Sequence, residues 1–158
     1  MKTRIAAAQI APCFLDLDAT VEKACRTIEI AAKEGAKLLV FPEAFISGYP
    51  DWVWVVPNSK GALLGDLYAE LVENAVSVPD NTTEKLCKAA KKAGINVVMG
   101  MNEKNSESSG TSLYNSLLYI DDTGSIIGKH RKLIPTGGER TIWAQGAGDD
   151  LVLSLIHI

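Results

Sequence analysis

The sequence contains few residues of the kinds that build disulfide frameworks and zinc sites. Its 158 residues include three cysteines, Cys13, Cys25 and Cys87, and two histidines, His130 and His157. No Cys-x-x-Cys pair occurs, and neither histidine lies near a cysteine in the sequence. Disulfide frameworks use even sets of cysteines, and structural zinc sites use closely spaced cysteine and histidine ligands. We therefore expect neither a disulfide framework nor a metal site.

The chain also lacks a basic block and a long apolar run. Its 16 basic and 19 acidic residues are spread along the sequence and give a formal net charge of −3, so nucleic acid is not an expected partner. The apolar runs are shorter than a bilayer span, and Gln9 and Pro12 interrupt the apolar start of the chain, unlike a signal peptide. The composition predicts a soluble, cytoplasmic protein without a membrane partner. Its 158 residues, 47% of them hydrophobic, suffice for one domain with its own core.

Helical and strand patterns alternate along the chain. Apolar residues recur at helical spacing over residues 19–34, 64–75 and 82–93, and Asp18 and Gly35 fit the two ends of the first helix. Apolar or alternating segments predict strands at residues 4–10, 37–42, 95–101, 112–120 and 126–133. Residues 43–61, 102–110 and 134–148 are predicted as loops. The alternation predicts an α/β architecture with helices packed on a sheet.

Charged residues fall at positions where α/β proteins carry chemistry. Glu43 directly follows the predicted buried strand 37–42, at the end of the strand where α/β proteins bind ligands. Partial burial there could raise the pKa of Glu43 toward that of a general base. The alternative is that Glu43 is a solvated glutamate in a loop. Lys132 shares a strand face with His130 and could stabilise an oxyanion, or only protect an edge strand from aggregation. Glu139 and Arg140 follow a glycine turn and could form a mere surface ion pair.

An aromatic segment stands out among the predicted loops. Tyr49, Trp52 and Trp54 are the candidate substrate-binding residues, because tryptophans grouped in a loop can form the wall of a pocket for an apolar substrate. An interface, or packing of the loop onto the core, would explain them as well. His130 is expected to pack within its strand rather than act as a base.

Several segments, taken in order, resemble the nitrilase, or carbon–nitrogen hydrolase, superfamily. The resemblance spans residues 3–150 and is specific because the segments occur in the family's order within the matching strands and helices. The segments are Ala7-Ala8-Gln9 with Pro12, Phe41-Pro42-Glu43-Ala44-Phe45 with Gly48-Tyr49-Pro50, Tyr114-Asn115-Ser116, Gly128-Lys129-His130-Arg131-Lys132-Leu133, and Pro135-Thr136 with Glu139-Arg140 and Trp143. Residues 49–54 and 139–143 are similar to true nitrilases, which convert organic nitriles to carboxylic acids and ammonia.

The resemblance implies an α-β-β-α sandwich, of which this chain would supply the N-terminal portion, and assembly into homo-oligomers. Glu43 would be the base that takes the thiol proton of a nucleophilic cysteine. Lys132 would stabilise the tetrahedral intermediate, and Glu139 would help to position the site. The cysteine would form a covalent thioimidate with a small-molecule nitrile and then an acyl-enzyme, without any cofactor.

The chain departs from the family's pattern at its C-terminal end. The family's nucleophilic cysteine lies downstream of the segment at 139–143, and Cys13, Cys25 and Cys87 do not match its motif. We therefore expect residues 1–152 to be the N-terminal part of a hydrolase domain, inactive alone and with one exposed, aggregation-prone sheet face. Residues 153–158, Leu-Ser-Leu-Ile-His-Ile, equal the translation of a transposase adapter used in DNA library preparation. We interpret them as an artefact rather than a natural strand.

Other functions stay open on the sequence alone. An amidase or carbamoyl hydrolase of the same superfamily would share the core segments, and substrate assays would separate it from a nitrilase. A naturally truncated, non-catalytic chain could instead bind full-length subunits and modulate their assembly. A nucleotide-binding domain fits least, because no phosphate-cradling glycine loop follows the first strand.

Overall fold

A mixed β-sheet forms the centre of the part of the chain that the computed structural model describes, residues 2–106 and 110–151. The strands are β1 (Ile5–Ala7), β2 (Leu38–Val40), β3 (Asn96–Lys104), β4 (Leu113–Ile120) and β5 (Ile126–Arg131), and they lie side by side in the order of the sequence. β1, β2 and β3 run parallel, whereas β3, β4 and β5 pair antiparallel. The predicted strands are therefore all present; β1, β2, β4 and β5 are shorter than predicted, whereas β3 extends further toward its C-terminal end.

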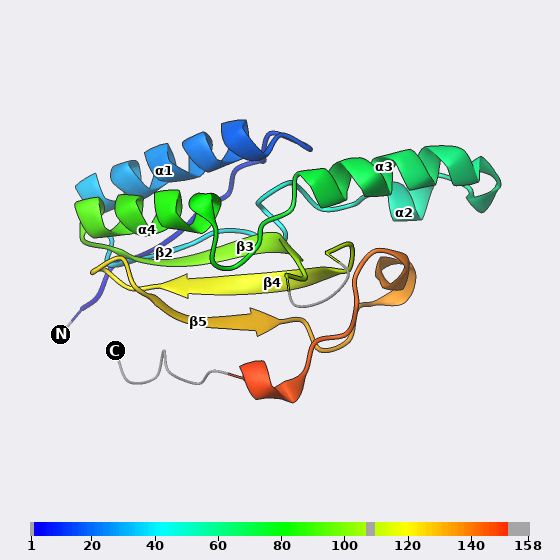
Figure 1. Cartoon of the computed structure of the whole chain (residues 1–158). Coiled ribbons are helices and arrows are strands. Elements are labelled where there is room, and N and C mark those ends of the chain that lie inside the picture. The colour runs from blue at the N-terminus through cyan, green and yellow to red at the C-terminus, as the bar shows by residue number, and fades with distance from the viewer. Residues whose placement is uncertain (1, 107–109, 152–158) are drawn as a thin grey trace.

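Two helices cover one face of this sheet, as Figure 1 shows. They are α1 (Leu17–Lys33) and α4 (Asn81–Ala93), which lie side by side. Gly94 ends α4 in the left-handed conformation, with φ 63°, which glycine adopts without steric cost. α2 (Trp52–Val55) and α3 (Gly61–Glu73) extend beyond this layer, at the end of the sheet where β3 and β5 finish (Figure 1). No helix among the described residues is both long and apolar enough to cross a bilayer.

The main core lies between α1, α4 and the sheet. Ile28 of α1 and Leu86 of α4 pack with Leu39, Met99 and Leu118 of the strands, and none of these side chains is more than 1% exposed. Burial of such a side chain contributes about 1.5–3 kcal/mol to stability. The predicted α/β architecture with helices on a sheet is thereby confirmed.

Strand register decides which polar side chains share a face of the sheet. Ser116 of β4 pairs with Arg131 of β5 on the face that α1 and α4 cover. Asn102 of β3 pairs with Asn115 of β4 on the opposite face, which we call the second face. His130 lies on the second face as well, because side chains alternate along a strand.

Several predicted boundaries are wrong. Asp16, not Asp18, caps α1, because its backbone is extended and its carboxylate accepts a hydrogen bond from a first-turn N–H at 2.9 Å. The predicted loop 43–61 contains α2 and the 3-10 helix η1 (Asn58–Lys60), and the predicted loop 134–148 contains η2 (Gly137–Thr141) and the start of η3 (Gly148–Asp150). β3 continues through Asn102 and Glu103, two residues predicted in a loop. The interpretation of residues 153–158 falls outside the described residues.

Candidate active site

Glu43, Lys132 and Glu139 come together at one end of the sheet. Nζ of Lys132 lies 3.0 Å from Oε1 of Glu43 and 2.8 Å from Oε2 of Glu139. Glu43 follows β2, Lys132 follows β5, and Glu139 lies in η2. One ammonium group is thus held between two carboxylates, in charge-assisted hydrogen bonds that are stronger than neutral ones.

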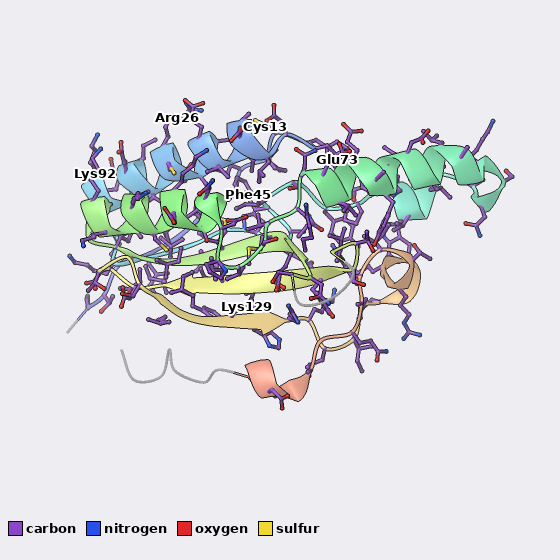
Figure 2. All side chains as sticks on the ribbon, viewed as in Figure 1. Cys13, Arg26, Phe45, Glu73, Lys92 and Lys129 are labelled. Carbon is purple, nitrogen blue, oxygen red and sulfur yellow. The ribbon has the colours of Figure 1, made fainter. Side chains whose placement is uncertain are left out.

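A tight turn after β2 presents Glu43. The Phe45 N–H donates to the Pro42 carbonyl at 3.3 Å, and Ala44 and Ser47 have φ values of 48° and 75°. Non-glycine residues seldom adopt such positive φ values, so the surrounding structure must hold the turn. Phe45, labelled in Figure 2, is 1% exposed and anchors the turn in the core.

Gly100 of β3 lies directly against this turn. A Cβ at Gly100 would lie 2.0 Å from the Pro42 carbonyl oxygen, which is far inside van der Waals contact. Gly100→Ala should therefore displace the turn that carries Glu43 and lower the free energy of unfolding by about 1–3 kcal/mol. Chemical denaturation of the chain measures this change.

Gly65 of α3 offers the matched control for that prediction. A Cβ at Gly65 has no atom within 4 Å, and alanine favours the helix interior by about 0.5–1 kcal/mol. Gly65→Ala should therefore raise the free energy of unfolding. A Gly100→Ala chain as stable as the unsubstituted one would show that the turn can move freely, and would contradict the conclusion that the surrounding structure holds it in place.

Asn115 of β4 orients Glu43. Its Nδ2 donates to Oε1 of Glu43 at 2.6 Å. The Glu43 side chain is 50% exposed, so the predicted burial of this carboxylate is only partial. Sequence reasoning gave Asn115 no role, because its position opposite the turn follows from the register of β4 rather than from any local signal.

The end of β5 carries Lys132 to the second face. Its peptide N–H donates to the Asn115 carbonyl at 2.8 Å, which extends the pairing of β4 and β5 by one residue. Burial by itself lowers the pKa of Lys132, but the hydrogen bonds to Glu139 and Glu43 outweigh it and the pKa is raised. Lys132 is consequently a protonated cation at neutral pH.

Glu139 is nearly fully buried, with 4% of its surface exposed. Its Oε2 accepts from the Thr136 N–H at 2.7 Å and its Oε1 accepts from the Tyr49 hydroxyl at 2.8 Å. Burial by itself raises the pKa of Glu139, but the bonds from Lys132, the Thr136 N–H and Tyr49 outweigh it and the pKa is lowered. The surface ion pair considered for Glu139 and Arg140 is not formed, because Arg140 donates to a backbone carbonyl.

The three aromatic candidates have different surroundings. The Tyr49 hydroxyl donates to Glu139 and accepts a hydrogen bond from Nε1 of Trp54 at 3.2 Å. Trp52 is 5% exposed and packs edge-on against Phe14, with ring centroids 5.9 Å apart. Trp52 also lines a pocket of about 460 Å³ between α2, α3 and η2. The structure thus brings Tyr49 to the charged trio but places Trp52 in a separate pocket.

A small pocket on the second face adjoins the trio. It has a volume of about 240 Å³, and its walls are Glu43, Asn115, Leu117, His130 and Lys132. His130 was expected only to pack within its strand, yet it shares this wall with Lys132, as the alternation along β5 predicts. Among the described residues no cluster of three or more metal-ligating side chains occurs.

Comparison with known proteins tests the resemblance read from the sequence. A profile of the carbon–nitrogen hydrolase family matches residues 4–155. The chain belongs to the carbon–nitrogen hydrolase family. The resemblance read from the sequence motifs is thereby confirmed.

Curated relatives of this carbon–nitrogen hydrolase chain include several nitrilases. It is 44% identical to a nitrilase of Bacillus sp. (strain OxB-1) over 150 residues, which are 93% of this chain and 41% of the relative. It is 42% identical to an aliphatic nitrilase of Rhodococcus rhodochrous over 151 residues, 96% of this chain and 38% of the relative. An arylacetonitrilase of Aspergillus niger is 39% identical over 151 residues, with 96% and 42% covered. The chain spans about two fifths of the length of these relatives.

Solved structures with a similar fold include those of an amidase. The carbon–nitrogen hydrolase chain matches the crystal structure of an amidase from Nesterenkonia sp. with a TM-score of 0.66 and 20% identity, covering 92% of this chain and 48% of the amidase. A variant structure of that amidase, described as a member of the nitrilase superfamily, gives a TM-score of 0.67 at 20% identity, covering 92% and 49%. The predicted nitrilase-type α/β fold is confirmed by this likeness.

Proposed function

We propose that this chain carries the base, the lysine and the supporting glutamate of a nitrilase, which hydrolyses an organic nitrile to a carboxylic acid and ammonia. The observation that carries the proposal is the position of Lys132 Nζ, 3.0 Å from Glu43 and 2.8 Å from Glu139. The nitrilase relatives, at 39–44% identity, support it. Attack on a nitrile carbon needs a nucleophile, a base that activates it and a cation near the developing charge. The trio supplies the base and the cation.

In the proposed mechanism Glu43 takes the proton of a cysteine thiol. The thiolate attacks the nitrile carbon, and the nitrogen takes up a proton to give a covalent thioimidate. A water then adds to the same carbon, and Lys132 stabilises the charge of the tetrahedral intermediate. Ammonia leaves, and a second water releases the carboxylic acid and restores the thiol. One nitrile and two waters thus give one acid and one ammonia, and no step needs a cofactor.

The cysteines of the described segment do not fit the role of nucleophile. Cys25 and Cys87 lie on α1 and α4, which cover the face of the sheet opposite the pocket. Burial raises the pKa of both thiols, which disfavours the reactive thiolate. Cys13 precedes α1, where its N–H and C=O both pair with the Thr20 hydroxyl. We therefore propose that the whole protein supplies the nucleophilic cysteine from sequence outside these 158 residues.

The test compares the whole protein with the 158-residue chain. The gene is read at its source through codon 152 without transposase adapters, and both proteins are expressed and assayed for ammonia release from an arylacetonitrile and an aliphatic nitrile. We expect activity from the whole protein and none from the chain, because only the whole protein contains the nucleophile. The control is a variant of the whole protein in which the proposed nucleophilic cysteine, outside these 158 residues, is replaced by alanine.

Two outcomes would overturn the proposal: ammonia release by the 158-residue chain, or an inactive whole protein. A reading frame that ends naturally after Ile158 would favour the non-catalytic assembly role instead. An amidase would use the same trio, so the relatives rather than the geometry favour a nitrile. Comparing kcat/KM for a nitrile and its corresponding amide separates the two, and size-exclusion chromatography of the whole protein tests the proposed homo-oligomer.

A further inference from the structure

Two consecutive polar residues, Asn102 and Glu103, are buried near the end of β3. Asn102 is 0% exposed and Glu103 is 2% exposed. Because side chains alternate along a strand, Asn102 points to the second face and Glu103 to the helix-covered face. The hydrogen-bond partners of Asn102 and Glu103 lie on the segments that carry Glu43, Lys132 and Glu139.

Glu103 ties β3 to β5 across β4. Its carboxylate accepts hydrogen bonds from Ser116 Oγ at 2.6 Å and from Lys129 Nζ at 2.6 Å. It also accepts from Nε of Arg131 at 3.1 Å and from Nη2 of Arg131 at 2.5 Å. Figure 2 labels Lys129 on β5. Ser116 belongs to β4 and the two cations belong to β5, so one side chain joins three strands.

This cluster determines where the end of β5 lies. Lys129 and Arg131 are 20% and 13% exposed, so their charges depend on Glu103 rather than on water. Burial by itself raises the pKa of Glu103, but the bonds from Arg131, Lys129 and Ser116 outweigh it and the pKa is lowered. The ring of Tyr114 lies 4.0 Å from the Arg131 guanidinium carbon and adds a cation–π contact. Lys132 is the next residue after this fixed arginine.

Asn102 holds the other two segments of the site. Its Nδ2 donates to the carbonyls of Ile46 at 3.1 Å and Gly48 at 2.9 Å, in the turn that links Glu43 to Tyr49. Its Oδ1 accepts from Nε1 of Trp143 at 2.8 Å. Trp143 is tied to η2, because its N–H donates to the Glu139 carbonyl at 2.8 Å.

We propose that Asn102 and Glu103 form a two-sided positioning pair for the site. Glu103 fixes Lys132 through Arg131 and Lys129, and Asn102 fixes the turn of Glu43 and the helix of Glu139. Neither is a catalytic residue, since both act through other side chains. The catalytic consequence rests on the proposed nitrilase function, whereas the positioning itself can be measured in the 158-residue chain.

The first test changes the Glu103 side of the pair. Glu103→Gln removes the charge, and Arg131→Lys keeps the ion pair but loses the fork of two donors. We expect kcat of the whole protein for a nitrile to fall between about tenfold and 10²-fold, with a smaller change in KM, because small misplacement of a reacting group costs that much. In the ¹⁵N-labelled 158-residue chain, NMR should show the pKa of Lys132 falling toward its ordinary value, since its contacts with Glu43 and Glu139 loosen.

The second test changes the Asn102 side. Trp143→Phe keeps the aromatic ring but removes the N–H that reaches Asn102, and Asn102→Asp replaces two donors by acceptors that face two carbonyls. Both should lower kcat while leaving Lys129 and Arg131 in place. In the labelled Asn102→Asp chain, the indole N–H signal of Trp143 should shift.

Asp80→Ala is the matched control for lost stability. Asp80 caps α4 by accepting the Thr83 N–H at 2.8 Å, away from the trio, and its loss costs about 0.5–2 kcal/mol. This variant should keep kcat and the pKa of Lys132. If Glu103→Gln and Arg131→Lys fold and keep both values, the positioning role is refuted. An inactive unsubstituted whole protein would refute the proposed function alone, because the NMR measurements would still report on positioning.

Discussion

Replacing Glu43, the proposed general base, with glutamine should lower kcat for the proposed nitrile hydrolysis by the whole protein about 10²- to 10⁴-fold, the usual contribution of such a base. The amide keeps the shape of the carboxylate and an oxygen that can accept from Lys132 and Asn115. It cannot take up a thiol proton, so the structure stays while the base is lost. The measurement is kcat and kcat/KM of the variant and of the unsubstituted whole protein with the same nitrile.

An exposed glutamate provides the control for this substitution. Glu73 ends α3 and is exposed, so Glu73→Gln should leave kcat unchanged. If Glu43→Gln keeps more than about a tenth of the activity, another group takes the proton and Glu43 loses the assigned role. Loss of activity in both variants would indicate an effect of net charge rather than of the base.

Replacing Lys132, the proposed oxyanion stabiliser, with methionine should lower kcat of the whole protein about 10²- to 10³-fold, as loss of one oxyanion-stabilising donor does. Methionine has a similar length but no charge. Glu139 would then be a buried carboxylate without its cation, and its pKa should rise. The pKa of Glu139 is lowered in the folded protein, so this residue stabilises the fold above its unfolded pKa, and that stability is lost as the pH falls through the folded value.

Lys132→Met should therefore also change how the free energy of unfolding depends on pH. Lys132 has a raised pKa, so its contribution is present below its unfolded pKa and is lost only in strong alkali. The stability difference between the unsubstituted chain and Lys132→Met should be large at neutral pH and shrink in acid. Denaturation at pH 7 and pH 3 measures it, and Lys60→Met, at an exposed lysine of η1, is the control. A difference that does not change with pH would show that Lys132 and Glu139 are not coupled.

Local sequence patterns predicted the parts of the site that depend on neighbours in the chain. The apolar run before Pro42 indicated a buried strand, and this placed Glu43 at a strand end. Alternation along β5 placed His130 and Lys132 on one face and Arg131 on the other, and the contacts of Arg131 with Glu103 and of Lys132 with Glu43 agree with it.

The remaining parts depend on partners distant in the sequence. The sequence predicted Asn102 and Glu103 in a polar loop. A single sequence does not show that Trp143 and Arg131 donate hydrogen bonds to these two side chains inside the sheet. Trp52 and Trp54 are two residues apart, yet one is 5% exposed and the other 53% exposed. The short helix α2 directs the two side chains to different sides, and composition alone does not predict that this segment is helical.

The order of strands across the sheet has a consequence for synthesis on the ribosome. The spatial order from β1 to β5 is also the order in which the strands are translated, and chains emerge N-terminus first at about 5–20 residues per second. Each strand can therefore add to the edge left by the strand translated before it, and none has to insert between two strands already paired. Glu43 leaves the ribosome long before Lys132 and Glu139 do, so the last members of the charged trio are translated only after all five strands of the described sheet.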